Sequence, residues 1–349
     1  RSAISLATGA ATVLTARDVF GVANVDRTLQ NLAQRDPLVT VAPNRQGIQI
    51  AGQNNRFNRF TVDGVDFGDP FCLEAGGLVS NRGPVPLDAI GEFSVEVAPV
   101  HIQQGNFLGG AINTQLKSGG NEFTFLGAAF YQDDALRGSR SRGLTRTGDF
   151  ESRIFTAQVT GPIIKDKLFF AVTYERTRDT VPANVQPSQL GITDAQLNEI
   201  GSIAQSVYGF DTLGVADSIT ERDDKLITKL DWNVAPGHRI SATYMWNESA
   251  LLSGQTAAGA INAINPTFSL LSNNFTQGAV NHFGVLQSNN QWTDNFSTIL
   301  RFSYADYLRL QVPIGGNRDF GQFQVCLDPT AVLPNLQCTP GVPRLTFGP

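Results

Sequence analysis

Three aspartates that recur at a spacing of three residues are the first candidates for chemistry in this sequence. They are Asp63, Asp66 and Asp69. Clustered carboxylates suit Ca²⁺, but the calcium loop of an EF-hand needs oxygen ligands at alternate positions and a distal glutamate. This segment has neither, so we expect no calcium site here.

The side chains that most often carry catalysis or hold cofactors are scattered. His101, His238 and His282 are isolated and lack the spacing of zinc ligands. The sequence contains no Gly-x-Ser-x-Gly elbow, no P-loop and no paired-glycine nucleotide fingerprint. We therefore expect no catalytic residue, no metal and no cofactor, and a function that depends on binding rather than on making bonds.

Two of the three cysteines stand close together in a Pro-rich, loop-like segment near the C-terminus. Cys326 and Cys338 are candidates for a disulfide, which would fit an oxidising compartment. The alternative is a pair of free thiols. Cys72 has no evident partner in the sequence.

The composition favours β-structure with frequent turns over a helical enzyme. Only 16% of the 349 residues are charged, against about 25% in a typical soluble protein, and Gly (34) and Phe (23) are plentiful. The net charge of −5 argues against a nucleic-acid surface. No run of about 18 apolar residues occurs, which excludes a transmembrane helix but not a membrane β-barrel, because closed barrels need no such run.

The pattern of the sequence changes near residues 117–120, which read Lys-Ser-Gly-Gly. Before this point, short apolar-rich segments mix irregularly with one helix, which indicates a small α+β domain over residues 1–120. The helix is expected at residues 25–35, with Val25, Leu29 and Leu32 on one stripe. Strands are expected at residues 11–15, 49–51, 60–65, 92–97 and 109–116.

After this point, segments of about ten residues alternate between apolar and polar side chains, as the strands of membrane barrels do. In residues 153–160, for example, Phe155 and Val159 lie opposite Thr156 and Gln158. Similar segments occur at residues 168–177, 226–233, 239–246 and 296–304. Residues 277–292 alternate poorly, which a β-bulge would explain. With a first strand at residues 121–132, we expect about seven antiparallel strands in residues 121–349.

The connections between these segments alternate in length. Short turns are expected at residues 161–167, 235–237 and 293–295, and long excursions at residues 179–224, 247–276 and after Leu310. Bacterial outer-membrane barrels have this asymmetry, with short periplasmic turns and long extracellular loops. The first long loop should carry a helix, because Thr193 and Gln196 have the spacing of a capping box.

Two further features agree with a membrane barrel. Six aromatic residues are expected near strand ends, where interface girdles lie. They are Trp232, Tyr244, Trp246, Trp292, Tyr304 and Tyr307. About seven strands cannot close such a barrel without leaving two open edges in lipid, so we expect the chain to be part of a longer one.

Three motifs in order resemble the plug domain of TonB-dependent receptors. The first is a strand ending in Gly52, followed by a loop and by a strand ending in Asp63-Gly64-Val65. The second covers residues 87–97, and the third is the Gly109-Gly110 pair with the segment up to Gly119, which resembles the junction of plug and barrel. Within the family the chain looks closest to the Oar-like branch. Ala98 stands where many siderophore receptors carry the Arg of an Arg-Gly-Pro segment, which argues against a siderophore ligand.

The resemblance implies a fold, a location and partners. It implies a plug over residues 1–120 inside the lumen of an antiparallel membrane β-barrel that begins at residue 121, in the outer membrane of a Gram-negative bacterium. It implies energised uptake driven by the TonB complex of the inner membrane through an upstream segment, contact with outer-membrane lipid and lipopolysaccharide, and a bulky solute such as a peptide or an oligosaccharide. The ligand contacts that it implies are the outward plug loops, namely Gln53, Asn54, Asn55, Arg56, Phe57, Asp69 and Phe71.

Two other functions remain open from the sequence. One is a structural or adhesive outer-membrane protein whose plug stays seated and whose long loops contact other surfaces. The other is a soluble β-rich carbohydrate-binding protein, which fits poorly with outward rows such as Ile240, Ala242, Tyr244 and Trp246.

Overall fold

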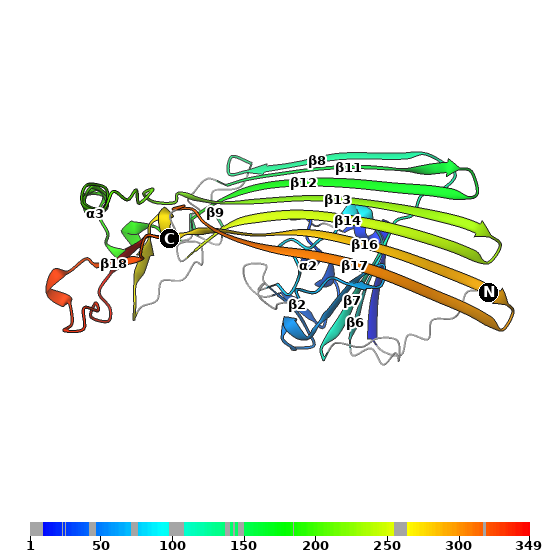
Figure 1. Ribbon diagram of the computed structural model, residues 1–349, viewed down its shortest axis with the longest axis horizontal. Helices are drawn as coiled ribbons and strands as arrows, with labels where there is room; N and C mark the ends of the chain where they lie inside the picture. Colours follow the sequence, from blue (N-terminus) through cyan, green and yellow to red (C-terminus); the bar gives the residue numbers. More distant parts are fainter. Residues whose placement is uncertain are drawn as a thin grey trace.

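A seven-stranded antiparallel sheet dominates the computed structural model of the protein. The structure describes residues 10–22, 24, 26–41, 47–70, 76–97, 108–136, 140–141, 144–145, 150–183, 185–254, 264–316 and 319–349. In the order β17-β16-β14-β13-β12-β11-β8, the strands lie side by side along the length of the molecule (Figure 1). Their bounds are β8 Thr124–Asp133, β11 Glu151–Ile164, β12 Leu168–Pro182, β13 Ser218–Ala235, β14 His238–Ser253, β16 Phe275–Thr293 and β17 Phe296–Pro313. The number of strands is the one that the alternating segments predict.

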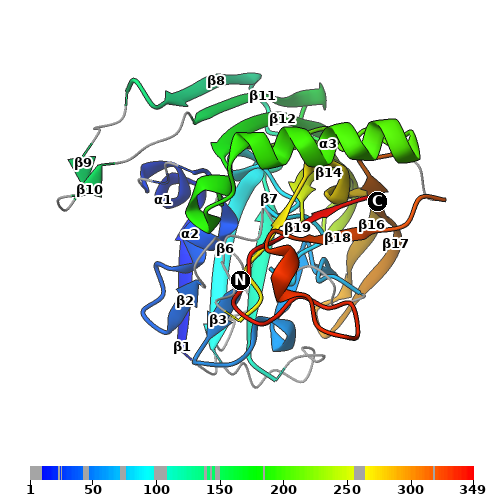
Figure 2. The same cartoon turned by 90° about the vertical axis from the view of Figure 1, so that its left-hand side faces the viewer.

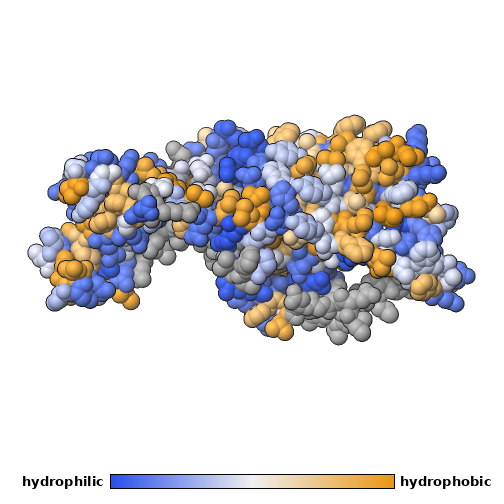
Figure 3. Space-filling model, viewed as in Figure 1, coloured by the Kyte–Doolittle hydropathy of each residue, from blue (hydrophilic) through white to orange (hydrophobic). Residues whose placement is uncertain are grey.

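The faces of this large sheet follow the alternation of the sequence. Thr156 and Gln158 on β11 are 0% and 8% exposed, whereas Phe155, the residue before Thr156, is 49% exposed. On β11, polar side chains therefore face inward and large apolar ones outward, the reverse of a soluble protein. Figure 3 shows apolar residues gathered over the large sheet.

The connections have the predicted asymmetry, with one shorter turn than expected. β11 continues through Ile164, so the predicted turn at residues 161–167 shrinks to residues 165–167. The other two short turns join β13 to β14 and β16 to β17 through two residues each. The pairing of β16 with β17 shifts register between Gln291 and Thr293, so the poorly alternating segment does contain an irregularity.

The sequence predicted that six aromatic residues lie near strand ends, and only some of them do. Trp232 and Trp292 are near the short-turn ends of β13 and β16, but Tyr244, Trp246 and Tyr304 lie in mid-strand. The reason is strand length: β14, β16 and β17 have 16, 19 and 18 residues, whereas about 9–11 residues cross a bilayer. Tyr307 is also in mid-strand and packs inward against the core.

A smaller α/β unit, here called the N-terminal unit (described residues between 10 and 117), lies on the concave side of the large sheet, which curves around it in the end-on view (Figure 2). Its main sheet has the order β1-β6-β7-β4-β5, and β2 pairs with β3. The strands are β1 Ala10–Thr15, β2 Val39–Val41, β3 Ile48–Ile50, β4 Arg59–Val62, β5 Val65–Asp66, β6 Ile90–Val97 and β7 Gly110–Leu116. The helices are α1 Ala16–Gly21 and α2 Leu29–Ala33, with 3₁₀ turns η2 Asn55–Phe57 and η3 Leu87–Ala89.

Two predictions for this unit were wrong in detail. The helix predicted at residues 25–35 begins only at Leu29, because the Thr28 hydroxyl caps it by accepting from the Asn31 backbone N–H; Val25 lies outside the described residues. The strand predicted at residues 60–65 is a hairpin. Asp63 and Gly64 both have positive φ (47° and 78°), which reverses the chain between β4 and β5.

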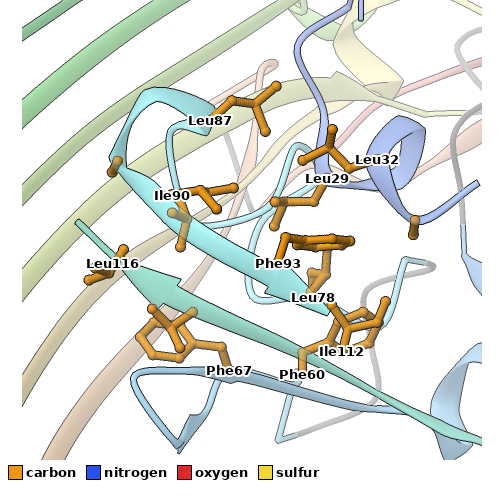
Figure 4. Packing of buried hydrophobic residues seen from close by; sticks show 14 of the residues in the cluster. Leu29, Leu32, Phe60, Phe67, Leu78, Leu87, Ile90, Phe93, Ile112 and Leu116 are labelled. Carbon is orange, nitrogen blue, oxygen red and sulfur yellow. The ribbon is translucent and has the colours of Figure 1, made fainter. Parts of the chain in front are cut away.

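One hydrophobic core joins the two sheets. It contains Phe60, Phe93 and Ile112 of the N-terminal unit, which Figure 4 shows beside α2. The inner face of the large sheet adds Ile227, Met245, Phe283 and Val285 to the same cluster. The Phe67 and Phe283 rings meet with centroids 4.1 Å apart.

The long connections build a second compact region, here called the loop unit (residues 185–217, 264–274 and 319–349). It contains the predicted helix, α3 Asp194–Tyr208, which begins with the predicted capping box of Thr193 and Gln196. A small sheet has the order β15-β19-β18. Its strands are β15 Thr267–Ser269, β18 Phe323–Cys326 and β19 Arg344–Phe347. The 3₁₀ turns η4 Pro187–Leu190, η5 Leu271–Asn273 and η6 Pro329–Ala331 also belong to the loop unit. Outside it, β9 Arg140–Ser141 and β10 Leu144–Thr145 form a separate two-stranded pair.

The loop unit has its own core and a covalent tie. Phe210, Phe268, Leu345 and Phe347 are buried together, and the Phe210 and Phe320 rings stack with centroids 3.9 Å apart. A disulfide joins Cys326 to Cys338 across a Cα–Cα distance of 5.6 Å. Cys72 lies outside the described residues. No helix in the described ranges is long and apolar enough to cross a membrane.

Candidate ligand loops and the contact between the two sheets

The predicted ligand residues 53–57 form a surface loop that follows β3. Gln53, Asn54, Arg56 and Phe57 are exposed, and Phe57 shows 45% of its surface. The Asn54 side chain accepts from the Arg56 backbone N–H at 3.0 Å, so it holds the 3₁₀ turn η2 in place. Asn54 thus has a structural role, while Arg56 and Phe57 present a guanidinium and a ring to the surroundings.

Asp69 lies close to this loop but is not at the surface. It is 7% exposed, and its backbone N–H donates to the Gly77 carbonyl at 3.0 Å. The Asn55 side-chain nitrogen stands 3.4 Å from where a Cβ on Gly77 would be, so Asn55 and Asp69 flank the same glycine. The structure therefore brings the two predicted loops together. Phe71, the last predicted contact, lies outside the described residues.

Two adjacent residues, Asn81 and Arg82, tie the N-terminal unit to strands β12 and β13 of the large sheet. The Arg82 guanidinium lies 2.5 Å from Asp179 Oδ2 on β12 and 4.0 Å from Glu221 Oε2 on β13. The neighbouring Asn81 amide donates to Glu221 Oε1 at 2.8 Å. Arg82 is 4% exposed, so its charge is compensated by these carboxylates rather than by bulk water.

A second tie lies at the turn between β4 and β5. The Lys229 ammonium of β13 lies 2.9 Å from Asp63 Oδ2, and the Thr243 hydroxyl donates to the same oxygen at 3.3 Å. Arg301 of β17 donates to the Gly64 carbonyl at 3.1 Å. The Asp63-Gly64 turn is thereby fixed to three strands of the large sheet.

Further along the same contact, β11 and β8 meet η3. The Gln158 amide donates to the Asp88 carbonyl at 2.8 Å. The Asp88 carboxylate pairs with Arg27, whose guanidinium lies 4.4 Å above the Phe130 ring of β8. A cavity of about 520 Å³ remains beside these residues, between α1 and β8.

The large sheet carries a buried polar row behind this contact. Lys225 is 1% exposed and lies 3.0 Å from Glu175 Oε1 and 3.6 Å from Asp223 Oδ2. The Asn247 amide donates to Asp223 Oδ1 at 2.6 Å. The Asn281 amide donates to Asn247 Oδ1 at 3.0 Å and lies 3.4 Å from the Val79 carbonyl of the N-terminal unit. Charged and amide groups of the sheet thus match those of the unit that covers them.

Sequence reasoning anticipated polar contacts between strands and the N-terminal unit but did not name Asn81 or Arg82. A signal was present, because Arg82-Gly83-Pro84 is itself an Arg-Gly-Pro tripeptide, placed before Ala98, the position where many siderophore receptors carry one. Residues 98–107 lie outside the described residues. Within the described part of the chain, no group of His, Cys, Asp or Glu side chains is arranged to hold a metal ion.

Comparisons with known proteins agree with this architecture. No family model matches the chain. The TonB-dependent transporter Oar of Myxococcus xanthus is 29% identical over 233 residues, which are 63% of this chain and 21% of that protein. The present chain therefore spans about a fifth of the length of this relative.

Solved structures show the same fold at low sequence identity. The outer membrane transporter YddB of Escherichia coli superposes with a TM-score of 0.58 and 12% identity, over 97% of this chain and 42% of that one. A mutant ferric enterobactin receptor of Pseudomonas aeruginosa gives 0.57 and 14%, over 98% and 44%. The siderophore receptor PirA of Acinetobacter baumannii gives 0.56 and 14%, over 87% and 40%. The chain is therefore a TonB-dependent receptor-like protein of the Gram-negative outer membrane, and it spans part of the length of the proteins that it matches.

Proposed function

We propose that the chain supplies the plug and the first barrel strands of an outer-membrane importer that the TonB complex energises. Residues 1–120 form the plug, and residues 121–349 form the first strands of the barrel together with extracellular loops. A solute such as a peptide or an oligosaccharide binds on the extracellular side, where the exposed residues of 53–57 contact it first. Asp69 and Phe71 are the further contacts that the sequence predicts, and Asp69 reaches the solute only when the loop above it moves, because it is 7% exposed in the seated state. The outward apolar face of the large sheet contacts outer-membrane lipid, including lipopolysaccharide.

The observation that carries this proposal is the seating of the N-terminal unit on the polar inner face of the large sheet. A polar contact can exchange its hydrogen bonds with water when the unit moves, so each one costs only about 1 kcal/mol net to break. The ion pairs of Arg82 and Lys229 fix where the unit sits.

The apolar part of the same contact explains why energy must be supplied. Four sheet residues, Ile227, Met245, Phe283 and Val285, are at most 6% exposed beneath the unit. Burial of such side chains is worth about 1.5–3 kcal/mol each, so exposing all four would cost about 6–12 kcal/mol. At that cost the unit would leave its seat spontaneously in fewer than about one molecule in ten thousand. Passage of a bulky solute therefore needs an external pull.

The test is whether a buried inner-face residue becomes accessible only in energised cells. Asn281 is fully buried between the large sheet and Val79. An Asn281→Cys variant in a Cys72→Ser background is exposed to a biotin maleimide in cells growing on yeast extract and starch hydrolysate. We expect labelling that disappears when a protonophore is added or the tonB gene is deleted. Glu199→Cys, on the exposed side of α3, is the control that should react in every condition.

Each result separates the candidate functions. Labelling that depends on energy and on TonB supports import. An Asn281→Cys residue that stays unlabelled in every condition supports a structural or adhesive protein whose plug is permanently seated, and it overturns the import proposal. Labelling that ignores energy describes a passively open pore and overturns it as well.

A further inference from the structure

A groove of about 830 Å³ runs along helix α3 in the loop unit. Figure 1 places α3 at one end of the molecule, away from β6 and β7 of the N-terminal unit. One stripe of the helix forms a bank of the groove, and the segment that follows the helix forms the facing bank, with Leu270 between them. This volume lies in the range of about 300–1,000 Å³ that is typical of small-ligand sites.

The helix presents a row of hydrogen-bonding groups to this groove. The side chains are Asp194, Asn198, Ser202, Gln205 and Ser206, and all five are exposed. None of them has a hydrogen bond or an ion pair among the residues that the structure describes. Carboxylate, amide and hydroxyl groups together offer both donors and acceptors, so a ligand can bind them without breaking a bond inside the protein.

The charge of the groove restricts the ligand. Asp194 and Asp211 are the charged residues that line it, and no Lys, Arg or His is among its lining residues. An anionic ligand would meet two carboxylates and no cation, so phosphate, carboxylate and catecholate groups are disfavoured. A neutral ligand with many hydroxyls matches the available donors and acceptors.

The groove is held in shape before a ligand arrives. The capping box of Thr193 and Gln196 fixes the start of α3, and Ala204, on the helix face next to the groove, is fully buried in the core of the loop unit. Gly201 lies in the groove, where an added Cβ would stand 3.6 Å from the Thr212 hydroxyl. Because little has to become ordered on binding, even a shallow polar site can bind measurably.

From these observations we infer that the α3 groove is a binding site for a neutral oligosaccharide, which it captures at the outer end of the protein. The inference deepens the proposed import function by naming the class of solute, and it rests on that function only for what happens to the ligand afterwards. A peptide is the weaker fit, because one bank of the groove is a helix whose backbone groups bond within the helix, and no cation is present to hold a C-terminal carboxylate.

The experiment measures binding by isothermal titration calorimetry to the full-length protein in detergent. The neutral probes are maltohexaose, cellohexaose and chitohexaose, and the comparison probes are hexagalacturonate and hexa-alanine. We expect at least one neutral hexasaccharide to bind and both comparison probes to fail. Asn198→Ala and Gln205→Ala should each weaken binding about three- to tenfold, as expected for the loss of one hydrogen bond.

Matched variants separate the groove from general effects on the helix. Gly201→Leu should abolish binding by filling the groove, whereas Gly201→Ala adds one methyl at ordinary contact distance and should bind like the wild type. Glu199→Ala lies on α3 outside the groove and should also bind like the wild type. Each variant is checked for unchanged thermal unfolding.

Several results would overturn the inference. These are failure of all three neutral sugars to bind, tighter binding of hexagalacturonate or hexa-alanine, or sugar binding that Gly201→Leu leaves intact. Because the measurement needs neither cells nor energy, it is independent of the Asn281→Cys labelling. If sugar binds but Asn281→Cys is not labelled in energised cells, the sugar-binding groove is supported and the import function is rejected.

Discussion

Lys229 and Asp63 join the large sheet to the N-terminal unit by an ion pair in which Nζ lies 2.9 Å from Oδ2. The same ammonium donates to the Leu116 carbonyl at 3.3 Å, and Asp63 Oδ1 accepts from the Leu116 backbone N–H at 3.0 Å. This one ion pair therefore joins the β4–β5 turn, the end of β7 and strand β13 of the large sheet. Both side chains are nearly buried, at 10% and 13% exposure, so either charge would be costly to leave alone.

Removing the ammonium should loosen the β4–β5 turn. We expect Lys229→Met to destabilise the seated state by about 3 kcal/mol, because Asp63 is left as a nearly buried carboxylate without a cation. Hydrogen exchange of residues 59–67 and 110–116 in the full-length protein should then be about a hundredfold faster. The amides of β8 and β11, at the far edge of the large sheet, should exchange at the wild-type rate.

The companion variants test whether the charge is the cause. Arg301→Met removes exposed hydrogen bonds to the Gly64 carbonyl and to Gln287 Oε1, and it should cost about 1 kcal/mol or less. Adding Asp63→Asn to Lys229→Met should recover part of the loss, since the lone carboxylate is gone while the residue still tolerates its positive φ. Equal effects of Lys229→Met and Arg301→Met would show that the ion pair has no special role.

Arg82 should matter more than its place in a loop suggests. Replacing it by Met leaves Asp179 and Glu221 without their cation, for an expected cost of about 3–5 kcal/mol. Limited proteolysis with chymotrypsin should then cut the N-terminal unit early while the strands of the large sheet remain intact. Arg82→Met combined with Asp179→Asn should be more resistant than Arg82→Met alone; a single variant as resistant as the wild type would contradict the prediction.

The inside and outside of the large sheet could be predicted from the sequence because the pleat fixes a period of two. Once Phe155 is assigned to one face, Thr156 and Gln158 must lie on the other, whatever the rest of the molecule does. The capping box at Thr193 is equally local, and α3 begins where it predicts. Such features need only the chemistry of neighbouring residues.

The seat of the N-terminal unit could not be predicted in this way. Arg82 meets Asp179 and Asp63 meets Lys229 only because two separately folded surfaces dock in one orientation. No periodicity in the sequence encodes that orientation. The start of α2 was missed for a smaller reason: the Asn24 side chain bonds the backbone of Thr28, which holds the residues before Leu29 in a loop despite their helical spacing.

The disulfide should stabilise the loop unit and leave the large sheet unchanged. Cys326 and Cys338 are separated by 12 residues, and closing a loop of similar size is worth about 3 kcal/mol. We expect the Cys326→Ser, Cys338→Ser double variant to show faster hydrogen exchange in residues 267–274 and 323–347. Exchange in β11 to β14 is the internal control, and a uniform acceleration there would mean that the loop unit and the sheet unfold together.

The outward face of β17 gives the sharpest test of the membrane location. Phe302 points outward and is 69% exposed, while its neighbour Ser303 points to the inner face and is also exposed. If both positions faced water, an arginine at either one would leave the free energy of unfolding nearly unchanged. In a bilayer Phe302→Arg should cost about 2–4 kcal/mol, because the charge must enter hydrocarbon, whereas Ser303→Arg faces the polar interior and should cost little. Urea titration of the full-length protein folded into phosphatidylcholine vesicles measures both values. Equal stability of the two variants would mean that this face of β17 does not contact lipid.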